Sequence, residues 1–318
     1  MEVITFGETM VLFNPDQMLP LEYVHQFGKS IAGAESNVAI GLQRLGHSVG
    51  WFGKLGNDPF GRFIHQFIRG QGVDTSHCIF SHEAPTGIMF KEKRTPATIQ
   101  VFYYRKNSAA SLLHPDELDE TYIGQAKILH LTGITPALSP SCKETIFRAI
   151  EIARSNGLQV VFDPNIRLKL WSKEEAKPVL REIAALADYV LPGLEEGKLL
   201  TGQKTPEDIA AALLDNGAKT VVVKLGKDGA YYQNRSSSGY VKGFPVANEV
   251  DPIGAGDAFA AGLISGILLE EALEMAVRRA NAVGAIVVGV NGDVEGLPTR
   301  EEVDQLLSDE LGNEDVIR

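Results

Sequence analysis

The second half of the chain alternates apolar runs with helical segments, and this alternation restricts the fold more than any other feature. Apolar strands are expected at 128–131, 160–165, 189–191 and 220–225, and the helices between them at 143–155, 174–187 and 206–216. Strands that are apolar throughout and separated by helices are covered on both faces, which is typical of parallel sheets. The sequence therefore predicts an α/β fold with a doubly wound, mostly parallel sheet.

Polar or glycine-rich stretches lie where the carboxyl ends of these strands are expected. They span 163–167, 193–196, 226–229 and 254–257. Ligands of open α/β sheets bind beyond the carboxyl ends of the strands, at the edge where these ends meet. We therefore expect the four stretches to contribute to one binding site.

The stretch Asp251-Pro-Ile-Gly-Ala-Gly-Asp257 precedes a run of small apolar residues, 258–269, that has the composition of a buried helix. Gly254 and Gly256 can take positive φ and let the backbone approach a ligand, and a helix start binds phosphate through its unpaired amides and dipole. A carboxylate at Asp257, beside such an anion site, suits proton abstraction from a hydroxyl next to a transferring phosphoryl group. An Asp that merely caps the helix would produce the same pattern.

Charge and cysteine content restrict the partners. The net charge of −11 offers no basic stripe, so a nucleic-acid partner is not expected. Cys78 and Cys142 form neither a CxxC pair nor a zinc-spaced cluster, which predicts a reducing, cytoplasmic location without disulfides. The N-terminus lacks a signal-peptide pattern, and the longest apolar stretch, 258–269, is too short to cross a membrane.

Common nucleotide motifs are incomplete. The sequence contains no GxxxxGK[ST], which excludes a P-loop, and neither Gly53 nor Gly254 opens a full GxGxxG. A dinucleotide-binding dehydrogenase is therefore a distant alternative.

Two stretches together resemble the signature sequences of the PfkB, or ribokinase-like, carbohydrate kinases. The first is Ala32-Gly-Ala-Glu-Ser-Asn-Val-Ala39 and the second is Asp251–Asp257, and the pattern fits from the N-terminal strand to about Leu307. The resemblance implies a single domain over 1–318, a ribokinase-like three-layer α/β/α sandwich with a central, mostly parallel sheet. It also implies a small β-sheet lid, with strands from about 10–32 and 79–107.

The same resemblance implies an ATP-dependent kinase with assigned residues. Asp257 would be the catalytic base, and the amides of Gly254, Ala255 and Gly256 would form the anion hole. Sugar hydroxyls would contact Gly33, Ala34 and Asn37, although Asn37 could instead cap a helix. The nucleotide would lie against Asn165, Arg167, Lys224, Gly226, Gly229, Gly254, Gly256 and Asn281, the last of which could instead lie on a solvated helix face.

Two metal positions follow from the resemblance. Glu196 would organise Mg²⁺ near the phosphates, but the family pattern Asn-x-x-Glu here begins with Gly193, so the coordination shell must differ. Asp251 and the carbonyl of Ile253 match positions that hold a monovalent cation such as K⁺. A turn-capping role explains Asp251 equally well.

Arginines indicate the substrate. Arg105 and Arg167 present planar charged groups suited to a carboxylate or phosphate, and in an acidic chain they favour an anionic sugar, although structural ion pairs are the alternative. The stretches 102–111 and 163–171 resemble the 2-keto-3-deoxygluconate kinases of the family. Tyr103 and Asp293 would be further substrate contacts, with a simple turn as the alternative for Asp293. Met89-Phe90 replaces a lid tyrosine of some of these kinases, which removes one hydrogen bond to the substrate.

The expected lid strand also bears on assembly. Ile99, Val101, Tyr103 and Arg105 share one face, while Phe102 and Tyr104 share the other. The second face could cover another subunit and make the protein a homo-oligomer, or the sheet could simply pack on the main domain. Beside the sugar-acid kinase, two alternatives remain: a fructokinase or other neutral-sugar kinase, and a non-catalytic sugar-binding regulator.

Overall fold

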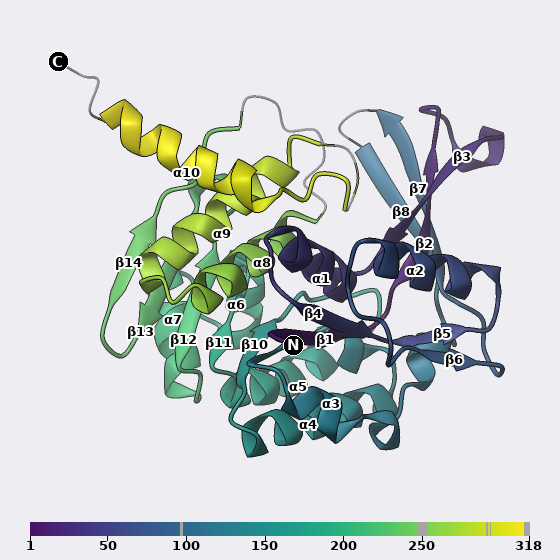
Figure 1. The fold of residues 1–318 in the computed structure, drawn as a ribbon, viewed down its shortest axis with the longest axis horizontal. Helices are drawn as coiled ribbons and strands as arrows, with labels where there is room; N and C mark the ends of the chain where they lie inside the picture. The colour runs from purple at the N-terminus through teal and green to yellow at the C-terminus, as the bar shows by residue number, and fades with distance from the viewer. Residues whose placement is uncertain (96–97, 247–253, 291, 293, 315–318) are drawn as a thin grey trace.

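An eight-stranded sheet forms the centre of the computed structural model, which describes residues 1–95, 98–246, 254–290, 292 and 294–314 (Figure 1). In order across the sheet, the strands are β14 (Ser238–Val241), β13 (Ala230–Asn234), β12 (Thr220–Lys224), β11 (Tyr189–Val190), β10 (Gln159–Asp163), β9 (Ile128–Thr132), β1 (Val3–Phe6) and β4 (Val49–Phe52). Strands from β12 to β4 pair in parallel, and β13 and β14 are antiparallel additions at one edge. The expected mostly parallel sheet is confirmed.

Helices cover both faces of this sheet and complete three layers (Figure 1). The layer around the first apolar core holds α1 (Ala34–Arg44), α2 (Pro59–Gly70), α8 (Ala255–Leu268) and α9 (Leu273–Val287), with α10 (Arg300–Glu314) against α9. The opposite layer holds α3 (Glu120–Gly124), α4 (Pro140–Ser155), α5 (Lys173–Leu186), α6 (Leu194–Thr201) and α7 (Pro206–Asp215). Short 3-10 turns are η1 (Leu21–Tyr23), η2 (Ala109–Leu112), η3 (Pro115–Glu117), η4 (Thr135–Ala137) and η5 (Gly226–Asp228). Within the described ranges, no helix has the length and hydropathy needed to span a bilayer.

A separate four-stranded sheet, the lid, projects from one end of the sandwich (Figure 1). Its order is β3 (Phe27–Ala32), β2 (Met10–Pro15), β7 (Ile88–Thr95) and β8 (Thr98–Tyr104). The expected lid segment 79–107 differs in one respect: β6 (Ile79–Ser81) pairs with β5 (Lys54–Gly56) in a two-stranded sheet of its own. The outward face of β8 leaves Phe102 41% and Tyr104 65% exposed.

Small residues let α8 pack closely on its neighbours. A Cβ atom added at Gly262 would lie 2.7 Å from the Ala280 Cα of α9, and one at Gly266 would lie 2.6 Å from the Ala276 Cα. Real Cβ atoms do not approach so closely, so these positions require glycine for steric reasons. The close contact between α8 and α9 therefore fixes the position of the first turn of α8, which lies near the carboxyl ends of the parallel strands, where the polar stretches meet.

Candidate active site

A cavity of about 440 Å³ lies between the carboxyl ends of the parallel strands and the lid, and is called the reaction cavity below. It brings together residues from both signature stretches, which are more than 200 positions apart in the chain. The residues assigned from the sequence that line it are Gly33, Ala34, Asn37, Tyr103, Arg105, Asn165, Arg167, Glu196, Lys224, Gly254, Gly256 and Asp257.

The start of α8 presents amide groups to this cavity. Gly254 is the N-cap residue with φ 86°, a left-handed conformation that favours glycine. The first backbone bond into the helix runs from the Ala258 amide to the Gly254 carbonyl at 2.9 Å, so the amides of residues 255–257 have no partner within the helix. Gly256 differs from expectation, because it is already helical and does not take positive φ. Its missing side chain instead leaves space toward Lys224, whose Nζ lies 3.6 Å from an added Cβ.

Asp257 stands in the first turn of α8 with only 8% of its surface exposed. The N-cap position belongs to Gly254 and no side-chain cap bond is present, so the interpretation of Asp257 as a cap is wrong. Burial raises the pKa of Asp257 above its ordinary value, although the Asn37 hydrogen bond and the charges of Arg167 and Lys224 oppose this rise. The buried carboxylate is therefore a stronger base than an exposed one.

Two asparagine side chains orient this carboxylate. Asn37 Nδ2 donates to Asp257 Oδ2 at 2.8 Å, and Asn165 Nδ2 donates to Asp257 Oδ1 at 3.2 Å. Asn37 is inside α1 rather than at its N-cap, which is Gly33, so the helix-capping alternative for Asn37 is also wrong. Asn165 reaches the carboxylate from the loop after β10, where its backbone has φ 37°.

A buried charge cluster lies beside Asp257. Lys224 Nζ pairs with Asp163 Oδ2 at 2.7 Å. Burial alone would lower the pKa of Lys224, but the carboxylates of Asp163 and Glu196 outweigh it and raise that pKa. The ammonium is therefore fully charged at neutral pH, at a point where it can meet a transferring phosphoryl group.

Glu196 is the candidate magnesium ligand, and both of its oxygens are held in place. Oε1 accepts the Ile166 amide and Oε2 accepts the Gly193 amide, each at 2.7 Å. The described residues hold no cluster of three acidic, His or Cys side chains that could cage a metal. Mg²⁺ is commonly bound by one or two carboxylates together with phosphate oxygens and water, so the free lone pairs of Glu196 fit this ion when a nucleotide is bound.

The lid contributes Arg105, whose guanidinium is not free. It forms an ion pair with Glu8, and Glu8 Oε1 also accepts the Ser108 hydroxyl at 2.6 Å. Sequence reasoning missed Glu8, which follows β1 at the carboxyl edge of the sheet; its position after a buried strand was the available signal. Arg105 therefore forms the structural ion pair named as its alternative and also lines the cavity. Arg167 lines the same cavity, is exposed and interacts electrostatically with Asp257.

Glu35 is a second residue that sequence reasoning missed, although it stands inside the first signature stretch. It is fully buried, and its Oε1 accepts the hydroxyls of Thr132 at 2.6 Å and Thr135 at 3.1 Å. Burial raises the pKa of Glu35 to about 7. Its contacts tie the first turn of α1, and with it Asn37, to the end of β9.

Three of the assigned nucleotide residues lie outside the reaction cavity. Gly226 lines an adjoining cleft that shares Glu196 and Lys224 with it. Gly229 has φ 97°, and a side chain there would collide with the Val241 carbonyl. Asn281 is buried, which excludes the solvated helix face, and its Nδ2 donates to the carbonyls of Val241 and Lys242 at 3.1 Å each.

Two assignments cannot be placed. Asp251, the expected monovalent-cation ligand, and Asp293, an expected substrate contact, lie outside the described residues.

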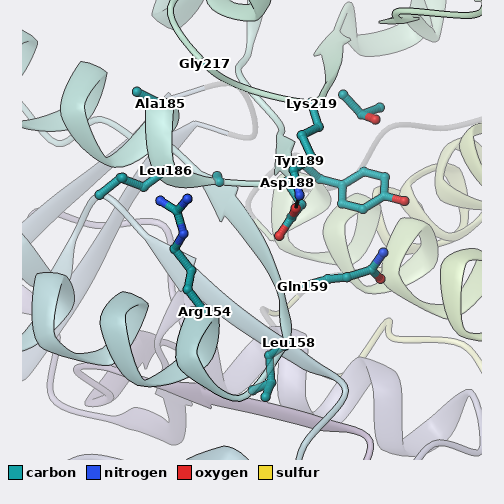
Figure 2. A pocket seen from close by; sticks show the side chains of 12 residues that line it. Arg154, Leu158, Gln159, Ala185, Leu186, Asp188, Tyr189, Gly217 and Lys219 are labelled. Atoms are coloured by element: carbon teal, nitrogen blue, oxygen red, sulfur yellow. Dashed lines mark ion pairs between the residues drawn. The ribbon is translucent and has the colours of Figure 1, made fainter.

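Another cavity of about 440 Å³ lies at the amino ends of the parallel strands, where β10, β11 and β12 begin (Figure 2). Its Asp188 is already engaged, because Oδ1 pairs with Lys219 at 2.5 Å and Oδ2 accepts the Val160 amide at 2.7 Å. None of the assigned residues that the structure describes lines it. The chemistry is therefore concentrated at the carboxyl edge, as expected for an open α/β sheet.

Comparison with curated proteins gives relatives that match nearly the whole chain. A Bacillus subtilis (strain 168) protein named 2-dehydro-3-deoxygluconokinase is 46% identical over 310 residues, covering 97% of this chain and 96% of its own. A Thermoproteus tenax protein of the same name is 36% identical, covering 96% and 94%. An Arabidopsis thaliana protein named probable fructokinase-7 is also 36% identical, covering 96% and 92%.

Solved structures agree with the fold. The PfkB protein from Polaromonas sp. JS666 has a TM-score of 0.89 at 43% identity, covering 95% of this chain and 99% of its own. An Escherichia coli structure in complex with ATP and Mg²⁺ has a TM-score of 0.90 at 29% identity, covering 97% and 99%. The model of the pfkB carbohydrate kinases matches residues 1–300. With this match over most of the chain, the protein belongs to the pfkB family of carbohydrate kinases.

Proposed function

We propose that this protein transfers the γ-phosphoryl group of ATP to the terminal hydroxyl of 2-dehydro-3-deoxygluconate and releases the 6-phosphate and ADP. The observation that carries the proposal is the pairing, in one cavity, of a buried base with two arginines in a chain of net charge −11. The base suits a hydroxyl, and the arginines suit a carboxylate on the same small molecule. The Bacillus subtilis relative carries the name of this activity at 46% identity.

In this mechanism the Asp257 carboxylate takes the proton of the sugar hydroxyl while its oxygen attacks the γ-phosphorus. The bond between the γ-phosphorus and the bridging oxygen breaks, and ADP leaves with the electron pair. The amides at positions 255–257 and the Lys224 ammonium stabilise the equatorial oxygens of the transferring group. Asn37 and Asn165 keep the base aligned.

ATP is placed along the Gly226–Gly229 turn, in the cleft that adjoins the reaction cavity. Mg²⁺, which neutralises phosphate charge when bound, would be held by Glu196 together with phosphate oxygens. The Escherichia coli neighbour, solved with ATP and Mg²⁺, supports the use of both by this chain. Asp251 is retained as a proposed K⁺ ligand. In this scheme Asn281 supports the β14 end of the nucleotide site through its bonds to Val241 and Lys242.

The sugar acid is placed with its hydroxyls against Gly33, Ala34 and Tyr103, and Asp293 is kept as a proposed contact. The lid would exclude water, which limits idle hydrolysis of ATP. We also propose that the exposed outer face of β8, with Phe102 and Tyr104, covers a second copy of the chain. A cytoplasmic location is supported by the two free thiols, Cys78 and Cys142.

A neutral-sugar kinase, such as a fructokinase, is the second candidate. The ion pair between Arg105 and Glu8 favours it, because this pair neutralises one of the two arginines before any substrate arrives. Arg167 therefore distinguishes the two candidate functions, because it is the arginine left to bind a substrate carboxylate. Among the described residues, it has no carboxylate partner at ion-pair distance.

Replacing Arg167 by Gln tests the proposal, with coupled kinase assays on the sugar acid, fructose and ribose. Loss of a charge-assisted hydrogen bond worth about 1.5–3 kcal/mol predicts that KM for the acid rises by about ten- to a hundredfold. The exposed Arg154, in the cavity at the amino ends of the parallel strands, gives the matched control Arg154→Gln. Turnover of fructose or ribose by the wild type without turnover of the acid would reject the proposed substrate.

A further inference from the structure

A larger cavity of about 780 Å³ adjoins the reaction cavity and is called the outer cavity here. Three residues line both: Tyr103, Arg105 and Arg167. Two further cations, Lys106 and Lys169, line the outer cavity but not the reaction cavity, and no Asp or Glu is among the described residues that line it. Because Glu8 neutralises Arg105, the described lining leaves three uncompensated cations, Lys106, Arg167 and Lys169, on a chain that carries 41 acidic against 30 basic residues.

The two cavities have opposite charge balance. The reaction cavity is lined by four carboxylates, Glu8, Asp163, Glu196 and Asp257, against the three cations Arg105, Arg167 and Lys224. An anion that approached this cavity directly from water would meet a net negative lining. The outer cavity reverses the sign of the field at the point where the two spaces meet.

Lys169 connects the outer cavity to the lid. Its Nζ donates to the Val101 carbonyl of β8 at 3.1 Å and lies 5.4 Å from the centre of the Tyr103 ring. The Arg105 guanidinium lies 5.6 Å from the centre of the same ring, and Tyr103 lines both cavities. Apart from Asn107 and Ser111, apolar side chains such as Leu138 and Ile166 form the rest of the described lining, and they lower the local polarity, which strengthens the field of the cations.

We infer that the outer cavity is the entrance through which an anionic sugar is drawn to the reaction cavity, with Lys106 and Lys169 supplying charge that attracts its carboxylate. The inference rests on the proposed function, because only an anionic substrate benefits from this field. The carboxylate passes from these lysines to Arg167, while the hydroxyl end moves on toward Asp257.

The test measures KM and kcat for 2-dehydro-3-deoxygluconate at saturating ATP, at low and high NaCl concentration. For the wild type, KM rises with salt while kcat changes little, since screening weakens attraction between exposed charges. The double variant Lys106→Gln/Lys169→Gln raises KM about three- to tenfold at low salt and flattens its salt dependence. Lys106→Gln alone also raises KM, although Lys106 makes no hydrogen bond to the lid among the described residues.

The matched control is Lys173→Gln/Lys204→Gln, which removes the same charge from exposed positions that line neither cavity. Its KM stays within about twofold of the wild type, because exposed charges at a distance are screened. If the wild type turned over the acid but its KM changed neither with salt nor on replacement of both lysines, the entrance inference would be wrong while the proposed function stood. If Lys169→Gln changed kcat and Lys106→Gln changed neither kcat nor KM, Lys169 would act only through its contact with the lid, and the entrance inference would be overturned. No turnover of the acid by the wild type would overturn the proposed function and the entrance together.

Discussion

Two asparagines from distant parts of the chain hold the Asp257 carboxylate, one at each oxygen. Burial raises the pKa of Asp257, the proposed base, and the hydrogen bond from Asn37 is the largest of the contacts that oppose the rise. The base works only when it is ionised, so kcat falls as the pH drops through this pKa. The position of the acid limb in the rate profile therefore depends on Asn37.

Removing that hydrogen bond should move the limb. In Asn37→Ala the ionised form of Asp257 loses a donor, so its pKa rises further and the acid limb of kcat shifts upward by about one pH unit or more. The measurement is kcat against pH at saturating substrates. Asn156→Ala is the control, because Asn156 Nδ2 donates to the Ile152 carbonyl at 2.8 Å, in α4 and outside the cavity lining. An unchanged limb in Asn37→Ala would show that Asp257 is not the titrating base.

At this scale the sequence indicated which residues gather but not which side chains bond to one another. Asn37 and Asn165 were assigned to ligands, and the structure places both on the base itself. The Asn165 contact depends on a φ of 37°, which no local pattern predicts for an asparagine. The Glu8 partner of Arg105 lies about a hundred positions away in sequence and became visible only in the folded chain.

Helix α8 is the element on which the proposed site depends, because its first turn contains both the amides of residues 255–257 and Asp257, the proposed base. The close contact with α9 at Gly262 and Gly266 sets the position of α8 in the sandwich. Glycine in a helix interior costs stability relative to alanine, so these positions are explained by packing rather than by helix propensity.

Gly262→Ala should therefore destabilise the protein. The added Cβ would lie 2.7 Å from the Ala280 Cα, and such overpacking costs about 1–3 kcal/mol of unfolding free energy. Gly284→Ala is the matched control in α9, where the nearest atom would be 3.6 Å away; there the helix should gain up to about 1 kcal/mol. Chemical denaturation of both variants measures the difference. Equal stability of the two would contradict the packing account of α8.

Elements with a strong local pattern were predicted, and those defined by pairing partners were not. The apolar strands β9, β10 and β12 match the expected positions. The assignment of β6 to the lid failed, since a three-residue strand carries no signal of which sheet it will join. The antiparallel edge formed by β13 and β14 was likewise undetermined, because short runs of apolar and polar residues fit several topologies.

Across the whole molecule, the sheet order gathers residues from four separate regions at one edge. Asn37 lies in the first turn of α1, Asn165 follows β10, Lys224 is the last residue of β12 and Asp257 lies in the first turn of α8. The family signatures predicted this convergence, while the uneven charge of the two adjoining cavities required the folded structure. The sequence pointed to Arg105 and Arg167 as substrate cations, and the structure places both at the boundary between the lid and the core.

The replacement Asp257→Asn tests the account most directly. The amide keeps the shape of the side chain and cannot accept the proton, so kcat should fall by about 10²- to 10⁴-fold. Calorimetric titration with the sugar acid and with ATP should still detect both ligands, because the cavity lining is otherwise intact. An Asp257→Asn protein that turned over at close to the wild-type rate would contradict the assignment of Asp257 as the catalytic base.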